Sequence, residues 1–264
     1  MRLQDQVVVI TGASSGIGAA IARVFAAEGA RLVLAARSEE KLNELAQTLG
    51  VAAGQVLVVP TDVRQPEQVR RLVGRTVEEF GTVDVLVNNA GIGMYAPYEQ
   101  VIWKHFCEMW EVNFFGAAYA MREVVPIMKQ RGRGTIVNIS SVAGRIPLPF
   151  MASYCATKFA LNALSDGVRM ELARDSIRVV LICPGRVRTP FHDRAYYDGG
   201  TAKYKGRIGR GISAERVART TLRATLGGRR EVVVPLVLRL AIGLRTFFPA
   251  LMDRLIRVFI FREV

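Results

Sequence analysis

An apolar segment runs directly into a glycine-rich turn near the start of the chain, and this junction limits the fold more than any other feature. Residues 7 to 10 read Val-Val-Val-Ile, and the next eight read Thr-Gly-Ala-Ser-Ser-Gly-Ile-Gly. Glycine lets a backbone turn tightly and approach a diphosphate, and a helix starting there offers free N–H groups to an anion. The junction predicts a dinucleotide site formed by Gly12, Ser14, Ser15, Gly16, Ile17 and Gly18.

Short β-branched runs alternate with segments of helical periodicity along the rest of the chain. We expect strands near residues 6–11, 31–36, 55–60, 83–88, 133–140, 177–183 and 231–235. Helices are expected near 16–29, 39–49, 66–80, 104–130, 151–174 and 213–227. This alternation predicts an α/β fold, a single-domain Rossmann fold whose doubly wound, seven-stranded parallel sheet carries helices on both faces. Ligands of such sheets bind beyond the carboxyl ends of the strands.

No repeat or linker divides the chain. Residues 1–235 are interpreted as the dinucleotide-binding and catalytic domain, and 236–264 as a C-terminal helical extension of it, split by Pro249 into two amphipathic helices. Residues 190–212 combine several glycines with tyrosines, which predicts a mobile flap more than a regular element.

Composition narrows the class of protein. Three widely spaced cysteines, with no C-x-x-C pair, predict neither disulfides nor a metal site. The start of the chain shows no secretion signal, so we expect a cytoplasmic protein, with membrane association through the tail as an alternative. The formal charge of +13 is spread out, without the long basic run of nucleic-acid readers, and no nucleic-acid partner is expected.

The residue at the end of the second expected strand distinguishes the two nicotinamide cofactors. Enzymes that prefer NAD place a carboxylate there for the ribose 2′-hydroxyl, whereas this chain reads Ala-Ala-Arg-Ser over residues 35 to 38. Arg37 could bind a 2′-phosphate, and Ser14 could add a donor, so NADP(H) is the predicted cofactor. The alternative is that Arg37 merely begins a solvated helix.

Two more strand ends carry candidate contacts to the adenosine. Asp62 and Val63 follow the third strand, and Asn89, Ala90 and Gly91 follow the fourth. Asp62 can accept a hydrogen bond from an adenine amino group, and small residues allow close approach to the ribose. Taken alone, Asp62 is equally well interpreted as a turn or cap residue.

A tyrosine and a lysine lie four residues apart at the start of a predicted helix, so Tyr154 and Lys158 share one helix face. A nearby ammonium stabilises a phenolate, which makes a phenol usable as an acid or base near neutral pH. Ser140 and Ser141 end the fifth strand at the same sheet edge and can hold a substrate oxygen. Asn113 is an amide inside a predicted helix, where burial requires hydrogen bonds.

Together these motifs, in this order and at this spacing over residues 6 to about 190, resemble the short-chain dehydrogenase/reductase family. The resemblance implies that Tyr154 is the general acid/base, that Ser141 holds the substrate oxygen, and that Asn113 supports a proton relay. It implies that Lys158 lowers the pKa of Tyr154 and binds the nicotinamide ribose, to which Tyr154 also lies close. Within the family-like segment 184–189, it assigns cofactor contacts to Pro184, Gly185, Val187 and Thr189.

The expected reaction interconverts a carbonyl and an alcohol by hydride transfer. Apolar segments after Ser141 and after Gly91 predict a lipophilic substrate. The two histidines, His105 and His192, are interpreted as non-catalytic. A different class of function, an NADP(H)-binding sensor or scaffold with little turnover, keeps the same fold and stays as the alternative.

The tail lacks the glycine-rich ending of the commonest bacterial members and resembles the hydroxysteroid dehydrogenase-like branch. Residues 223 to 264 hold eight arginines against three acids, a net charge of +5. Packing against another subunit of a homodimer or homotetramer is the favoured interpretation of the tail. Peripheral contact with anionic lipid is the alternative.

Overall fold

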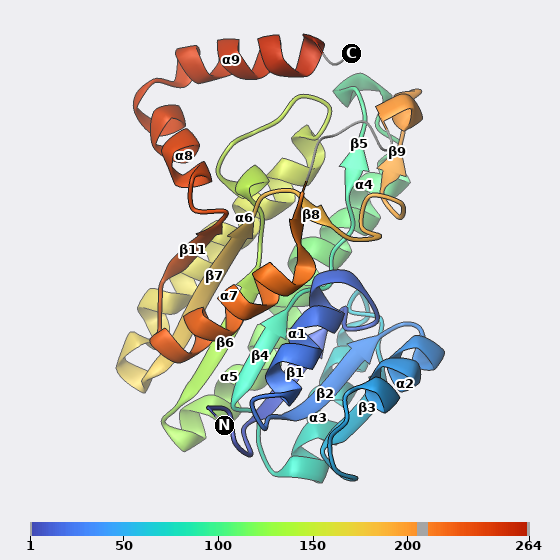
Figure 1. The fold of residues 1–264 in the computed structure, drawn as a ribbon, viewed down its shortest axis with the longest axis vertical. Helices are drawn as coiled ribbons and strands as arrows, with labels where there is room; N and C mark the ends of the chain where they lie inside the picture. Colours follow the sequence, from blue (N-terminus) through green and yellow to red (C-terminus); the bar gives the residue numbers. More distant parts are fainter. Residues whose placement is uncertain (1, 205–210, 263–264) are drawn as a thin grey trace.

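Seven parallel strands form one sheet in the computed structural model, which describes residues 2–204 and 211–262. The strands are β1 (Val7–Thr11), β2 (Arg31–Ala36), β3 (Val56–Pro60), β4 (Val85–Asn88), β6 (Gly134–Ile139), β7 (Ile177–Pro184) and β11 (Glu231–Val234). Their order across the sheet is β11-β7-β6-β4-β1-β2-β3 (Figure 1). The chain starts in the middle, builds one half outward, and then builds the other half. The predicted doubly wound sheet is confirmed.

Helices cover both faces of the sheet. They are α1 (Gly16–Ala26), α2 (Glu39–Thr48), α3 (Pro66–Phe80), α4 (Trp103–Trp110), α5 (Gly116–Arg131), α6 (Ala152–Glu171), α7 (Ala214–Gly227), α8 (Leu238–Phe247) and α9 (Pro249–Arg262). Alternate side chains of each strand enter opposite cores. Val8 and Ile10 pack with α1, α2 and α7, whereas Val7 and Val9 pack with α3, α5 and α6. Each fully buried large aliphatic side chain stabilises the fold by about 1.5–3 kcal/mol.

The single helix expected over 104–130 is wrong in one respect. Between α4 and α5 the chain forms a π-helical turn, Glu111–Phe115, with Asn113 buried at its centre. Such turns insert one residue into a helix and are often found at functional sites. The side chain of Asn113 is bound to backbone outside the helix, which explains why regular helical periodicity is interrupted there.

The segment expected to be a mobile flap is partly regular. Residues 205–210 lie outside the described residues, but the part before them forms β9 (Tyr196–Tyr197), and the part after them leads into β10 (Ile212–Ser213). The short strand β8 (Val187–Arg188) comes just before the segment. β9 pairs in parallel with β5 (Met94–Tyr95), and β10 pairs with β8. We keep the name flap for the described residues 190–204, since they cover the carboxyl edge of the sheet.

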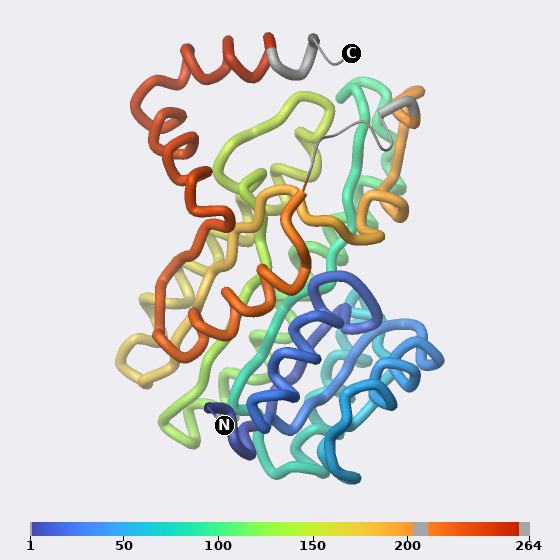
Figure 2. Tube along the Cα trace, viewed as in Figure 1, coloured from blue at the N-terminus to red at the C-terminus, as the bar shows by residue number. Residues whose placement is uncertain are grey.

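The tail leaves the edge strand β11 as two helices, and Pro249 opens the second, as predicted. Leu238 and Ile242 of α8 pack on buried residues of β7 and β11. α9 lies at the same end of the long axis as β5 and β9 (Figure 1), and the Cα trace in Figure 2 shows it running across the top of the molecule, apart from the sheet. Within the described part of the chain, no helix has the length and apolar character needed to span a membrane.

Candidate active site

The glycine-rich turn joins β1 to α1 in the predicted geometry. Gly12 and Gly16 have φ values of 65° and 58°, in the left-handed region that other residues rarely adopt. Ser15 occupies the N-cap position of α1 but makes no side-chain cap hydrogen bond, and the first turn contains no acidic residue. The first N–H groups of α1 therefore have neither a side-chain cap nor a negative neighbour, as an anion site requires.

Asn89 fixes this turn from the next strand. Its side-chain amide donates to the carbonyl oxygens of Thr11 and Gly12, each at 3.0 Å. The hydroxyl of Thr11 in return accepts from the backbone N–H of Asn89 at 3.0 Å and of Ala90 at 3.2 Å. Asn89 thus acts on the shape of the turn, and Ala90 and Gly91 line the adjoining edge. Sequence reasoning assigned Asn89 to the cofactor directly and missed this bracing role.

The two residues predicted to recognise the adenosine half differ in their surroundings. Arg37 is exposed and forms no ion pair with any residue that the structure describes, while Ser38 caps α2. The carboxylate of Asp62 accepts from Nε and Nη2 of Arg64, with the shortest contact at 2.6 Å. It also accepts from the backbone N–H of Arg64. Asp62 therefore behaves as the turn residue that the sequence left open. Val63 packs its side chain against Gly116.

Asn113 links the π-helical turn to the end of β4 and to α6. Its Oδ1 accepts from the N–H of Ile92 at 2.8 Å, and its Nδ2 donates to the carbonyl of Ile92 at 2.9 Å. Nδ2 also lies 3.2 Å from the hydroxyl of Thr157, the residue before Lys158. A side chain at Gly91 would come within 3.3 Å of Asn113 Oδ1 and 3.7 Å of Lys158 Nζ, so both surround this glycine.

The two serines after β6 have separate partners. Ser140 is buried and donates to Asn162 Oδ1 at 2.5 Å, which makes it part of the core. Ser141 begins a short 3-10 turn, where its hydroxyl accepts from the Ala143 N–H at 3.0 Å and lies 3.5 Å from the carbonyl of Pro184. Of the two serines, Ser141 is the one that acts on Tyr154, because its hydroxyl lowers the pKa of that phenol in part.

Tyr154 and Lys158 lie on one face of α6 and are both buried. The ammonium of Lys158 is 5.9 Å from the centroid of the Tyr154 ring and donates to the carbonyl of Ile139 at 3.1 Å. On its other side the Tyr154 ring meets the edge of Phe191 from the flap, with centroids 5.9 Å apart. The phenol is thereby enclosed between the sheet edge and the flap.

Burial dominates the electrostatics of this pair. It raises the pKa of Tyr154 well above the ordinary value of a phenol, and the hydrogen bond with Ser141 lowers that pKa in part. It lowers the pKa of Lys158 to about 8. The sequence-based expectation of a lowered tyrosine pKa includes an oxidised nicotinamide beside the phenol; in the protein without it, burial has the largest effect on this pKa. A phenol that keeps its proton is suited to donate it.

The last predicted cofactor segment lies beside the glycine turn. Thr189 is the neighbour that a side chain at Gly16 would meet, at 3.2 Å. Pro184 ends β7 and Gly185 follows it, and the N–H of Gly185 donates to the carbonyl of Val234 at 2.7 Å. The side chain of Val187 is buried in the core, so only its backbone is available to a ligand. The structure brings all these residues to one sheet edge.

Several polar contacts that hold the flap were not predicted. His105 of α4 lies 2.8 Å from the carboxylate of buried Asp198 and stacks on Tyr196 with centroids 4.0 Å apart. His192 contacts the hydroxyl of Tyr95 at 3.0 Å. Arg194 donates to the hydroxyl of Ser15 at 3.0 Å, which joins the flap to the glycine turn. These partners are about 90 or more residues apart in sequence, so no local pattern indicates them.

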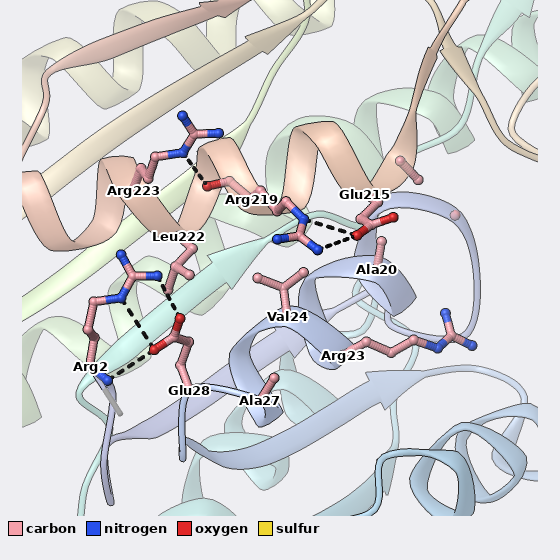
Figure 3. Close-up of a pocket in the computed structure, with 12 residues that line it drawn as sticks. Arg2, Ala20, Arg23, Val24, Ala27, Glu28, Glu215, Arg219, Leu222 and Arg223 are labelled. Carbon is pink, nitrogen blue, oxygen red and sulfur yellow. Dashed lines mark hydrogen bonds and ion pairs between the residues drawn. The ribbon is translucent and has the colours of Figure 1, made fainter.

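A groove of about 800 Å³ lies outside the site, between α1 and α7 (Figure 3). Figure 3 shows its arginines on both walls, where Arg2 is paired with Glu28 and Arg219 with Glu215. Apart from Gly16, its lining contains no residue assigned to the chemistry. The groove is therefore a surface feature of the α1 and α7 pair.

Comparison with known proteins places this geometry in a family. The model of the short chain dehydrogenase family matches residues 6–198. The uncharacterized oxidoreductase YxnA of Bacillus subtilis is 36% identical over 259 residues, 96% of this chain and 72% of its own length. Dehydrogenase/reductase SDR family member 7B of Mus musculus is 35% identical, over 96% of this chain and 80% of its own length. These matches include most of the tail.

Solved structures agree. A short-chain dehydrogenase/reductase from Burkholderia phymatum in complex with NAD superposes with a TM-score of 0.87, at 30% identity over 95% of this chain and 96% of its own. A metagenomic short-chain oxidoreductase in complex with NADP gives a TM-score of 0.75, at 31% identity over 89% and 98%. The chain is an oxidoreductase of the short-chain dehydrogenase/reductase family.

Proposed function

We propose that this chain is an NADP(H)-dependent oxidoreductase that interconverts a carbonyl and an alcohol on a lipophilic substrate. The observation that carries the proposal is the grouping of Ser141, Tyr154 and Lys158 around one buried point at the carboxyl edge of the sheet. Known neighbours include complexes with NAD and with NADP, so the preference for NADP(H) depends on Arg37.

The residues present fit a dinucleotide. The uncapped start of α1 suits the diphosphate, Arg37 suits a 2′-phosphate, and Lys158 would donate to a ribose hydroxyl. When bound, the nicotinamide would supply or accept the hydride. The contacts of Thr189 and of the Val187 backbone belong to the same proposal.

The chain's own side chains would manage the proton. In the reducing direction Tyr154 would donate its hydroxyl proton to the carbonyl oxygen, and the Ser141 hydroxyl would hold that oxygen. Lys158 would stabilise the phenolate that remains, and Asn113 would support the return of a proton to Tyr154 through its links to Ile92 and Thr157. The buried setting excludes water from the reacting carbon.

Absorbance at 340 nm with NADPH, then NADH, over a panel of lipophilic ketones and aldehydes tests the proposal. We expect NADPH oxidation that falls by about 10²–10⁴-fold in Tyr154→Phe, the usual contribution of a general acid. Ser140→Ala is the matched control, because Ser140 faces the core. Tight NADPH binding without turnover across the panel would favour the sensor or scaffold function instead.

For the tail we propose contact with another subunit of a homodimer or homotetramer. Its exposed apolar residues include Leu240 and Phe247, at 75% and 78% exposure, and exposed apolar patches often mark interaction sites. The neighbouring arginines are compatible with peripheral contact with anionic lipid, which is the alternative.

A further inference from the structure

Arg186 carries a buried guanidinium nitrogen that meets no hydrogen-bond partner within the described part of the chain. Arg186 follows Pro184 and Gly185 at the end of β7, and its Nη1 is buried from solvent without a hydrogen-bond partner. Arg186 also forms no ion pair with any residue of the described ranges 2–204 and 211–262. Leaving a charged donor buried and unpaired is costly, so such a group is a candidate to meet a ligand.

The guanidinium acts on side chains of the flap and of β5. Burial raises the pKa of Tyr95 and of Tyr197, and the positive charge of Arg186 opposes that rise. Burial lowers the pKa of His192, and the same charge adds to that effect, so the guanidinium lies near all three side chains. The hydroxyls there already have other partners, because Tyr95 contacts His192 Nδ1 at 3.0 Å and Tyr197 donates to the His192 carbonyl at 2.9 Å. The carboxylate of Asp193 also acts on Tyr197 and His192, but Asp193 is exposed.

These aromatic residues continue to the catalytic tyrosine. The ring of Phe191 meets His192 at a centroid distance of 5.5 Å on one side and Tyr154 at 5.9 Å on the other. Met94, Met109 and Cys155 complete an apolar cluster around Tyr154. A substrate whose carbonyl lies at Tyr154 would therefore have apolar side chains beside it. The guanidinium of Arg186 would lie near the same aromatic residues.

We propose that Arg186 binds an anionic group of the substrate, and that the substrate is an apolar carbonyl compound carrying a carboxylate. This inference rests on the proposed function, whose lipophilic substrate it makes more specific. A carboxylate matches the planar fork of a guanidinium and supplies two acceptors to a group that has none from the described protein. The apolar cluster around Tyr154 accounts for the rest of the molecule.

The test measures binding without turnover. Hexanoate, octanoate and decanoate, each against its methyl ester, are titrated calorimetrically into the full chain. We expect the carboxylate to bind about 10- to 100-fold more tightly than its ester, as for a hydrogen-bonded charged group. In Arg186→Met the ratio should fall to within about threefold of one. Equal affinity of acid and ester in the unaltered protein would overturn the proposal.

Arg188→Met is the matched control. It removes the same charge two residues further along, where the side chain is exposed and bound to the Gly211 carbonyl, and it should keep the acid preference. Arg186→Lys keeps the charge without the fork and should bind the acid with intermediate affinity. An acid preference that survives Arg186→Met, or a variant that loses only NADPH affinity, would assign Arg186 another role and reject the proposal.

Turnover is measured separately, so the two proposals can fail separately. Keto acids of matching length and their methyl esters are assayed with NADPH. Selective acid binding with no turnover of any compound would reject the redox function and leave the anion site standing. Turnover of ketones with no preference for acids would support the redox function and reject the anion site.

Discussion

The ammonium of Lys158 is buried beside a phenol, with the Ile139 carbonyl as its hydrogen-bond partner. Such a group favours its neutral form in the folded protein, which explains a pKa of about 8 against the ordinary 10.5. Below pH 8 the folded state must charge a buried lysine, and this opposes folding. The same property lets Lys158 respond to a phenolate or to a ribose nearby.

A pH dependence of stability follows for the cofactor-free protein. Between pH 8 and 10.5 the unfolded chain binds more protons at Lys158 than the folded chain, so stability from this group rises with pH. Relative to Lys158→Met, the unaltered protein should gain about 3 kcal/mol over this interval. Urea unfolding of both proteins at pH 7, 9 and 10 measures it. If the stabilities of the two proteins changed in parallel with pH, the lowered pKa of Lys158 in the folded state would be contradicted.

Arg37 sets the expected choice of cofactor. Arg37→Ala should lower kcat/KM for NADPH by about 10- to 100-fold, because a charge-assisted contact to the 2′-phosphate is lost, and should leave NADH within about threefold. Steady-state kinetics with both cofactors measures this. Arg71→Ala, which removes an exposed charge on α3, is the control. Equal losses with NADH would indicate a general effect of charge.

The elements that carry the site were predictable to different degrees. Tyr154, Lys158 and the glycine turn follow from local spacing, since residues four apart on a helix, or a turn between strand and helix, bring their own geometry. The π-helical turn at Asn113 was not predictable from local spacing, because the partner of the Asn113 side chain is Ile92, 21 residues away. Arg186 lies within the family-like segment 184–189, but the lack of a partner for its Nη1 depends on the fold.

The flap is held by polar contacts to α4, and these can be removed singly. Asp198 is buried, accepts from the Ile102 N–H at 3.0 Å and pairs with His105 at 2.8 Å. Asp198→Ala should destabilise the protein by about 1–3 kcal/mol and speed tryptic cleavage after Arg194 of the flap. Asp193→Ala, on the same segment but exposed, should behave as the unaltered protein. Unchanged cleavage in Asp198→Ala would show that apolar contacts hold the flap.

At the scale of the whole molecule, the site and the tail share a border. Gly185 carries an N–H bound to Val234, and a side chain there would come within 2.6 Å of Leu238 at the start of α8. Arg145, which follows the turn begun by Ser141, pairs with Glu231 of β11 at 2.5 Å. The edge strand thus connects the substrate side of the site to helices whose outer faces are apolar.

The tail, residues 236–264, is expected to contact another subunit. The double variant Phe247→Asp and Phe248→Asp places charge on two side chains that are 78% and 60% exposed. If they pack against another subunit, light scattering after size exclusion should show a smaller mass at unchanged secondary structure. Tyr98→Asp, an equally exposed change outside the tail, is the control. An unchanged mass together with lost co-sedimentation with anionic vesicles would favour the lipid alternative.

The flap touches both halves of the site within three residues. Phe191 lies against Tyr154, and Arg194 reaches Ser15 of the glycine turn. A displacement that exposes the phenol must also withdraw the arginine from the turn, because so short a segment moves as one piece. Dinucleotide and carbonyl compound would then enter and leave through the same opening event, and neither could be exchanged while the other kept the flap in place.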